Sequence, residues 1–293
     1  MLRIDNLKLP VGAKEDKLRA ACAHALRVNE EALVSVHLLR RSIDAREGVK
    51  LVCSAAVEVK NESGVLRRCK NKNVQPYAPK KYAPPAPVSA PEVSPVVIGA
   101  GPAGLFCALL LARCGARPIL LERGRAVEQR KRDVEHFWRT GELDLTSNVQ
   151  FGEGGAGAFS DGKYNITNDF GGTLHEYIGK KQALDLMHYV DEINMAYGGE
   201  GTKLYSTAGT KFKKLCIQNK LNLLDASVRH LGTDVNLVVL SNLYDLLKDK
   251  VDFYFDSPVT TIAREGEGYR VTVGETDYTC DKCIVSVGRV GSK

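Results

Sequence analysis

Three glycines, Gly99, Gly101 and Gly104, carry a G-x-G-x-x-G spacing directly after the apolar run from Val96 to Ile98. In a strand–turn–helix unit, the first glycine allows a tight turn, the second lets a pyrophosphate approach the backbone, and the third lets the helix pack on the strand. The start of the helix adds free N–H groups and a partial positive charge for the phosphates. We therefore interpret this segment as a nucleotide-binding turn rather than a strand–helix unit with an incidental glycine turn.

Glu122 closes this unit. A stretch of helix formers from Leu105 to Cys114 follows the turn, and a second strand, Ile119 to Leu121, ends at this acid. A carboxylate about 20 residues beyond the glycine turn accepts hydrogen bonds from a ribose hydroxyl. Because an acid repels a 2′-phosphate, the sequence disfavours NADP at this turn.

A second glycine-rich stretch runs from Phe151 to Lys163 and reads Phe-Gly-Glu-Gly-Gly-Ala-Gly-Ala-Phe-Ser-Asp-Gly-Lys. So many glycines make either a loose surface loop or a segment whose backbone approaches a large planar or anionic ligand. Phe151 and Phe159 bracket the loop, and a purely solvated loop has little use for aromatic side chains. The sequence favours the ligand over the loose loop.

The elements that position these loops fall into two predicted domains. Most of the prolines lie between Pro76 and Pro95, in a stretch without hydrophobic periodicity that is typical of a semi-rigid linker. We expect a small α+β domain at residues 1–75, a proline-rich linker at 76–95 and a dinucleotide-binding domain at 96–293. The pattern of the first domain predicts one helix and three strands: a strand at Met1 to Leu9, a helix at Glu15 to Leu26, and strands at Leu33 to Leu39 and Val49 to Lys60.

Helices and short strands alternate through the second domain. The pattern predicts a helix from Ala126 to Thr140, a mostly helical stretch from Leu184 to Leu247 and a strand from Val251 to Phe255. Three short alternating segments predict an antiparallel meander: Thr260 to Ala263, Tyr269 to Val273 and Thr276 to Thr279. A final apolar strand, Cys283 to Val287, ends at Gly288, and a glycine at the carboxyl end of such a strand lies on the cofactor edge of a doubly wound sheet.

Composition bounds the class of protein. The chain has 293 residues, 44% of them hydrophobic, and its eight cysteines are too scattered for a disulfide framework, so we expect a globular protein with reduced thiols. No apolar stretch approaches the roughly 20 residues of a membrane span, and no signal peptide is evident, so a cytoplasmic location and no membrane partner are expected. Residues 1–95 carry 17 Lys and Arg against 10 Asp and Glu, a net charge of +7. Such an excess is usually a solvated surface, so nucleic acid is not expected as a partner.

Three further stretches are distinctive: Phe137-Trp138-Arg139-Thr140-Gly141, Asn148-Val149-Gln150-Phe151-Gly152-Glu153-Gly154-Gly155-Ala156-Gly157 and Phe159-Ser160-Asp161-Gly162-Lys163. With them the chain resembles an uncharacterised bacterial and archaeal family of FAD-dependent dehydrogenases or oxidoreductases, within the flavoproteins that have two dinucleotide-binding domains. The resemblance also includes Arg41-Ser42-Ile43-Asp44-Ala45-Arg46 and Leu231-Gly232-Thr233-Asp234. It spans nearly the whole chain.

The resemblance implies an α/β fold, in which a Rossmann-like FAD/NAD(P)-binding domain with a β-meander is split in sequence and preceded by the small α+β domain. It also implies FAD as cofactor, a small-molecule substrate, and NAD(P)H as one candidate electron donor. Family members are longer, so we expect this sequence to be a truncated reading frame or a cloned fragment whose flavin site is incomplete at the C-terminus. The residues expected at the cofactor are Gly99, Gly101, Pro102, Ala103, Gly104, Glu122, Arg123, Gly154, Gly155, Ala156, Gly157 and Gly288.

Alternatives to a flavoenzyme stay open at this point. The chain could be a non-catalytic nucleotide-binding fragment, or its basic first domain could bind an anionic partner. Cys280 and Cys283 form a C-x-x-C, but Cys283 begins an apolar strand, where a thiol acts as a small hydrophobe. A second C-x-x-C is missing, so no metal site is expected. His230, beside a Gly-Thr-Asp turn, is a candidate acid or base, although a surface histidine at a turn is the commoner case. The sequence identifies no catalytic residue.

Overall fold

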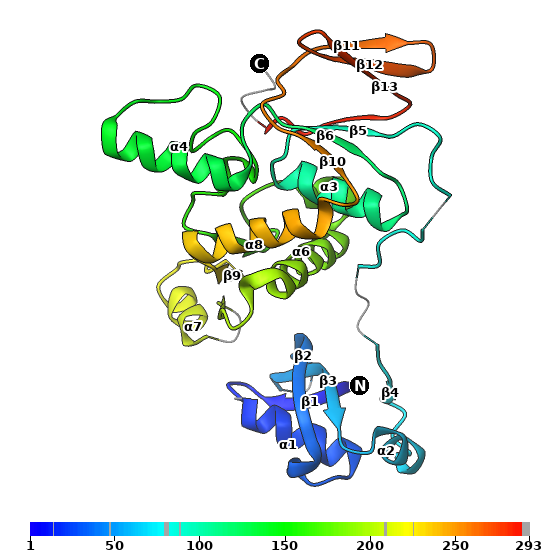
Figure 1. Ribbon diagram of the computed structural model, residues 1–293. Helices are drawn as coiled ribbons and strands as arrows, with labels where there is room; N and C mark the ends of the chain where they lie inside the picture. Colours follow the sequence, from blue (N-terminus) through cyan, green and yellow to red (C-terminus); the bar gives the residue numbers. More distant parts are fainter. Residues whose placement is uncertain are drawn as a thin grey trace. The chain divides into compact units, whose positions relative to one another are not determined.

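The computed structural model describes residues 1–13, 15–46, 48–78, 82–87, 89–207, 210–224 and 226–288. The chain divides into two compact units, Met1–Lys80 and Lys81–Lys293, and each is described by itself (Figure 1). Within the described ranges, no helix combines the length and apolar character needed to cross a membrane.

The first unit is a four-stranded antiparallel sheet with two helices. Its strands follow the order β2-β3-β1-β4 and alternate with the helices as β-α-β-β-α-β, which is the ferredoxin-like topology. The predicted helix and three strands are present, and β2 is five residues longer than expected. The elements are β1 Leu2–Pro10, α1 Glu15–Leu26, β2 Leu33–Asp44, β3 Lys50–Val59, α2 Glu62–Arg68 and β4 Val74–Pro76.

One face of this sheet buries the core of the first unit. Leu2 and Ile4 of β1 and Val57 of β3 are fully buried because alternate residues of a strand point to the same face. Cys22 and Leu26 of α1 pack in the same cluster. The helix α2 and the strand β4 have no counterpart in the sequence prediction, because both are short and β4 is defined mainly by its pairing with β1.

The second unit is built on a parallel sheet in the order β10-β6-β5-β14. Its strands are β5 Val96–Ile98, β6 Ile119–Leu121, β10 Asp252–Tyr254 and β14 Cys283–Val285. The inner strands bury both faces. Val97 and Leu120 pack in the cluster that holds α3 Pro102–Arg113 and α8 Thr233–Leu247, whereas Val96 and Ile98 pack against the meander. The sheet therefore lies between a helical layer and an antiparallel layer (Figure 1).

The predicted meander is confirmed. It consists of β11 Val259–Glu265, β12 Gly268–Val273 and β13 Thr276–Cys280, paired in that order, with turns at Gly266 and Gly274 in the left-handed region. The last strand is two residues shorter than predicted. Just beyond the strand, the Ser286 backbone N–H donates to the carbonyl of Ile98, and its hydroxyl donates to the carbonyls of Ile98 and Gly99, which holds the chain against the end of β5.

The stretch from Leu184 to Leu247, predicted to be mostly helical, also contains two strands. In the antiparallel order β7-β9-β8, β9 pairs both with β7, a strand near the second glycine loop, and with β8. Each has only three or four residues and a partner far away in the sequence, so local periodicity does not show them. Between β6 and α8, the helices and strands of the second unit are α4 Val127–Thr140, β7 Lys163–Ile166, α5 Leu174–Ile178, α6 Lys180–Asn194, β8 Leu204–Ser206, α7 Lys211–Gln218 and β9 Ser227–His230.

Candidate dinucleotide-binding site

Two of the three glycines in the first turn are required by the packing of the chain itself. Gly99 has φ +99°, and a Cβ at this position would lie 2.6 Å from the carbonyl oxygen of Ser286. A Cβ on Gly104 would lie 1.8 Å from the carbonyl oxygen of Gly99. These glycines bring β5, α3 and the end of β14 together.

Gly101 differs from its two neighbours. Its φ is −70°, which any residue adopts, and a Cβ there would meet nothing nearer than the Cα of Gly155 at 3.9 Å. Gly101 is the N-cap of α3 and its helix has no side-chain cap, while the next two residues, Pro102 and Ala103, are exposed. The first N–H groups of a helix have no intrahelical partner. At Gly101 the turn thus exposes backbone without a side chain at the start of α3, although the fold of the turn does not require glycine at this position.

Glu122 lies at the carboxyl end of β6 and is buried, with 5% of its surface exposed. Its Oε2 accepts a hydrogen bond from the Ala100 N–H at 2.7 Å. Its Oε1 accepts from Gly124 at 2.9 Å and from Gly152 at 3.2 Å. The expectation from the sequence was a carboxylate facing a ribose, and the structure adds that this carboxylate joins three loops.

Arg123 is exposed beside this carboxylate. Its guanidinium carbon lies 4.1 Å from the centre of the Phe151 ring, a cation–π distance. The contact ties the residue after the acid to the aromatic that opens the second glycine loop. Phe151 therefore has a partner within the site.

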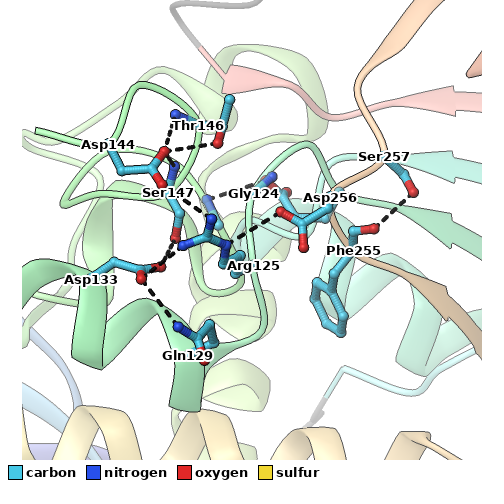
Figure 2. Close-up of polar contacts among 12 residues, drawn as sticks. Gly124, Arg125, Gln129, Asp133, Asp144, Thr146, Ser147, Phe255, Asp256 and Ser257 are labelled. Carbon is cyan, nitrogen blue, oxygen red and sulfur yellow. Dashed lines mark hydrogen bonds and ion pairs between the residues drawn. The ribbon is translucent and has the colours of Figure 1, made fainter. Parts of the chain in front are cut away.

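Arg125 is held among three carboxylates at the same edge (Figure 2). Its guanidinium nitrogens lie 2.8 Å from Asp133, 3.2 Å from Asp144 and 3.5 Å from Asp256. The hydrogen bond and charge of Asp133 raise the pKa of Arg125. The backbone N–H of Asp256 also donates to the carbonyl of Gly124 at 2.9 Å, so the cluster fixes the chain where β6 and β10 end.

The second glycine loop lies directly against the first. The N–H of Gly154 donates to the carbonyl of Ala100 at 2.8 Å, and a Cβ on Gly155 would lie 3.1 Å from the Cα of Gly101. Gly152, Gly154 and Gly155 have φ values of +114°, +81° and +62°, so they adopt a backbone that other residues avoid. Ala156 and Gly157 are exposed. The structure brings together the two glycine segments that the sequence singled out.

Buried charges lie beneath the start of this loop. Arg130 of α4 has no exposed surface and donates to three carbonyls, those of Asn148 at 2.8 Å, Gly152 at 3.3 Å and Glu153 at 2.6 Å. The carboxylate of Glu153, also fully buried, accepts from the Val127 N–H at 2.9 Å. Burial lowers the pKa of Arg130 to about 10 and raises the pKa of Glu153 to about 7. Arg130 Nη2 and Glu153 Oε1 have no hydrogen-bond partner among the described residues.

An amide holds the other end of the loop. Asn236 of α8 is 2% exposed and donates to the carbonyls of Gly157 and Ala158, each at 3.0 Å. Its oxygen accepts from the hydroxyl of Tyr164 in β7. The loop is rich in glycine and nevertheless has fixed backbone contacts at both ends.

Sequence reasoning missed Arg130, Asn236 and Ser286. A signal existed for the first two, since Arg130 lies on the apolar stripe of α4 with Val127 and Val134, and Asn236 begins the buried stripe of α8. A charged or amide residue on an apolar helix stripe is a candidate for a buried hydrogen-bonding role. Ser286 had no such signal because its partners are backbone carbonyls of a distant strand.

The remaining candidates lie outside this contact network. Gly288 is exposed with φ +67°, and nothing lies within 4 Å of the Cβ it would carry. Burial raises the pKa of Cys280, and that of Cys283 to about 11, which disfavours a reactive thiolate at the C-x-x-C. His230 is exposed at the end of β9.

Comparison with known proteins identifies the second unit more closely than the first. A model described as a domain of unknown function matches residues 1–60, and a model described as FAD dependent oxidoreductase matches residues 95–289. An uncharacterized protein of Clostridium beijerinckii is 31% identical over 294 residues, which cover 98% of this chain and 48% of that protein. The chain thus spans about half the length of this curated relative.

Solved structures give only partial likenesses of fold. NikD, an unusual amino acid oxidase essential for nikkomycin biosynthesis, has a TM-score of 0.37 at 14% identity, covering 68% of this chain and 51% of NikD. Thioredoxin reductase of Lactococcus lactis has a TM-score of 0.30 at 13% identity, covering 66% of this chain and 35% of that enzyme. At these scores neither one bears on substrate or mechanism.

Proposed function

The chain belongs to the family of FAD-dependent oxidoreductases through residues 95–289, and on that premise we propose that it is the FAD-binding part of an oxidoreductase that acts on a small molecule. FAD is the cofactor of this family. In this proposal residues 1–75 form a separate α+β domain, residues 76–95 link it, and residues 96–293 form the split cofactor domain. The residues proposed to hold FAD are Gly99, Gly101, Pro102, Ala103, Gly104, Glu122, Arg123, Gly154, Gly155, Ala156, Gly157 and Gly288.

Gly101 is the observation that carries the proposal. Neither its φ of −70° nor its surroundings require a glycine, since a Cβ would meet only the Cα of Gly155 at 3.9 Å. A side chain at this position would instead fill the space beside the uncapped start of α3. That space suits a pyrophosphate, because the helix start offers unpaired N–H groups and the positive end of the helix dipole.

Glu122 is proposed to accept a hydrogen bond from the adenosine ribose through Oε2. That oxygen accepts only the Ala100 N–H among the described residues, whereas Oε1 already accepts two N–H groups. A carboxylate oxygen has two lone-pair directions, so Oε2 can take one more donor. The same carboxylate would hold the ribose and fix the loops around it.

When bound, FAD supplies hydride or electron transfer through its isoalloxazine ring. The protein's own task is to bind and orient it, and the ordered backbone of Gly154 to Gly157 is the segment proposed to lie near the ring. The substrate and an electron donor such as NAD(P)H are proposals that concern the whole protein. A cytoplasmic location is also proposed, and it is supported by eight cysteines that form no disulfide.

The test is Gly101→Val, with Gly101→Ala as the milder variant. We expect the purified chain to bind FAD, detected by flavin absorbance and by mass spectrometry of the released ligand. Gly101→Val is expected to lose the cofactor while its far-UV circular dichroism and its thermal unfolding without cofactor stay unchanged. An unchanged FAD content in Gly101→Val would contradict the site. A chain that binds ADP but no FAD would instead favour the nucleotide-binding fragment.

A further inference from the structure

We propose that Arg130 is a positioning residue that sets the backbone of the second glycine loop for the flavin end of the cofactor. This inference rests on the proposed function, since it needs FAD at the loop. Arg130 itself is fully buried on α4 and is placed to act through the loop rather than on the ligand.

The contacts of Arg130 converge on the start of the loop. Its Nη1 donates to the carbonyls of Gly152 and Glu153 at 3.3 and 2.6 Å, and its Nε donates to Asn148 at 2.8 Å. A Cβ on Gly152 would lie 2.5 Å from the Cδ of Arg130, so the side chain packs directly against that glycine. The planar guanidinium has donors in a fixed fork, which makes it suited to hold several carbonyls in one geometry.

Arg130 also contacts the aromatic at the far end of the loop. Its guanidinium carbon lies 5.0 Å from the centre of the Phe159 ring. Phe151 and Phe159 bracket the glycines in the sequence, and each has an arginine over its ring, Arg123 for the first and Arg130 for the second. One buried side chain therefore connects Gly152, Glu153 and Phe159.

Burying the Arg130 guanidinium costs desolvation free energy, and its hydrogen bonds show which part of the chain it holds in place. Neighbouring positions on the same helix stripe, Val127 and Val134, are apolar, and an apolar residue at 130 would complete the core at lower desolvation cost. All three glycines between 152 and 155 have a left-handed backbone, and such residues are flexible unless other groups fix them. Among the described residues, the hydrogen bonds of Arg130 go to the backbone carbonyls of Gly152 and Glu153 in this segment and of Asn148 just before it, and to no carboxylate. Its role is therefore to order the loop.

The experiment compares Arg130→Gln with Arg132→Gln, an exposed arginine on the same helix. Amide hydrogen exchange is measured at residues 152–158 without cofactor, and dissociation constants are measured for FAD and for ADP. For Arg130→Gln we expect exchange in the loop to rise at least about tenfold, because hydrogen bonds to a charged group are lost. FAD affinity should fall by about tenfold or more, while ADP affinity changes by less than about threefold, since ADP contacts the first turn and Glu122.

Three results would overturn the proposal: loop exchange equal to that of Arg132→Gln, faster exchange with unchanged FAD affinity, or equal losses for FAD and ADP. The last result would mark a merely structural residue. A wild-type chain that binds no FAD would refute the proposed function instead, and the exchange data would still decide whether Arg130 orders the loop.

A second variant covers the case in which Arg130→Gln fails to fold. Arg130→Lys keeps the charge and the stem but loses the fork, so it can reach fewer of the three carbonyls. Arg130→Lys is expected to fold. Its loop exchange and FAD affinity should lie between the values of wild type and Arg132→Gln and the tenfold defects expected for Arg130→Gln. FAD affinity and loop exchange identical to wild type in Arg130→Lys would contradict a need for the planar fork and overturn the proposal.

Discussion

The glycine turn at residues 99–104 and the glycine loop at residues 152–157 touch through Gly101 and Gly155, yet they are held by different means. Backbone approach fixes the first turn, with Gly99 and Gly104 packed against the carbonyls of Ser286 and Gly99. Buried side chains fix the second loop, with Arg130 at its start and Asn236 at its end. Glu122 accepts hydrogen bonds from both segments and is the shared contact.

This difference separates two ways of building a rigid loop. The turn at 99–104 is enclosed by strands and a helix, so a change of glycine is felt directly as a collision with backbone. The loop at 152–157 depends on charged and amide groups supplied by α4 and α8, so its rigidity responds to their hydrogen bonds and to pH. Substitutions in the two segments should therefore differ in size and in kind.

The largest effect is expected for Gly104→Ala. The new Cβ would lie 1.8 Å from the carbonyl oxygen of Gly99, so α3 and β5 must separate. We expect a loss above about 4 kcal/mol in the free energy of unfolding, the range of severe core disruption. Urea unfolding followed by Trp138 fluorescence reports the second unit, because Trp138 is the only tryptophan. Gly101→Ala is the matched control and should lie within about 1 kcal/mol of wild type.

A smaller but pH-dependent effect is expected for Glu153→Gln. Burial raises the pKa of Glu153 from 4.5 to about 7, while Arg130 lowers it and Glu122 and Glu128 raise it further. The unfolded chain then ionises this carboxyl at lower pH than the folded chain. The contribution of protonated Glu153 to the free energy of unfolding is therefore complete below pH 4.5 and is lost as pH rises through about 7. The loss amounts to about 3 kcal/mol by the usual conversion of a pKa shift.

Glu153→Gln removes this ionisation. Between pH 5 and 8 its free energy of unfolding should therefore fall by about 3 kcal/mol less than that of wild type. Its stability should exceed that of wild type at pH 8 and match it near pH 5. Glu135→Gln, which changes an exposed acid on α4, is the control for the background titration. Parallel pH profiles for the two variants would show that Glu153 ionises normally in the folded chain.

The first turn illustrates what local sequence predicts well. Gly99, Gly101 and Gly104 share one strand–turn–helix unit, and Glu122 follows at the end of the next strand, so neighbours in sequence are neighbours in space. The meander was predictable for the same reason, because its strands are joined by short turns at Gly266 and Gly274. The strands β8 and β9 were not, because each is short and depends on pairing with distant residues.

The second loop illustrates the limit. Its glycines predicted a close approach of backbone, but the residues that order it come from 22 positions earlier and 79 positions later in the chain. Nothing in the local pattern relates Arg130 to Gly152 or Asn236 to Gly157. Glu122 was predicted from the sequence to accept a hydrogen bond from a ribose. Its hydrogen bond from the Gly152 N–H of the second loop could not be predicted in the same way. Such contacts follow from the packing of α4 and α8.

An intermediate effect, shared by both segments, is expected for Glu122→Gln. The carboxylate accepts three N–H groups, from Ala100, Gly124 and Gly152. A glutamine places an NH₂ group where one oxygen was, so at least one buried N–H loses its acceptor, at a cost of about 2 kcal/mol. Amide exchange should rise in both glycine segments, unlike in Arg130→Gln, where the second loop should change most. Faster exchange in only one segment would contradict the shared role of Glu122.

The smallest effect on stability is expected for Gly157→Ala. The Cβ meets nothing within 4 Å, and its backbone lies outside the left-handed range, so alanine fits without strain. Because alanine restricts the unfolded chain, the free energy of unfolding should rise by about 0.5 kcal/mol. Gly155→Ala is the contrast, since its φ is +62° and its Cβ would lie 3.1 Å from the Cα of Gly101, so it should destabilise. If the cofactor passes over the exposed end of the loop, Gly157→Ala should weaken FAD binding while the protein becomes slightly more stable. Weaker FAD binding together with higher stability would distinguish a glycine required by the ligand from one required by the fold. Unchanged FAD affinity would remove Gly157 from the proposed site.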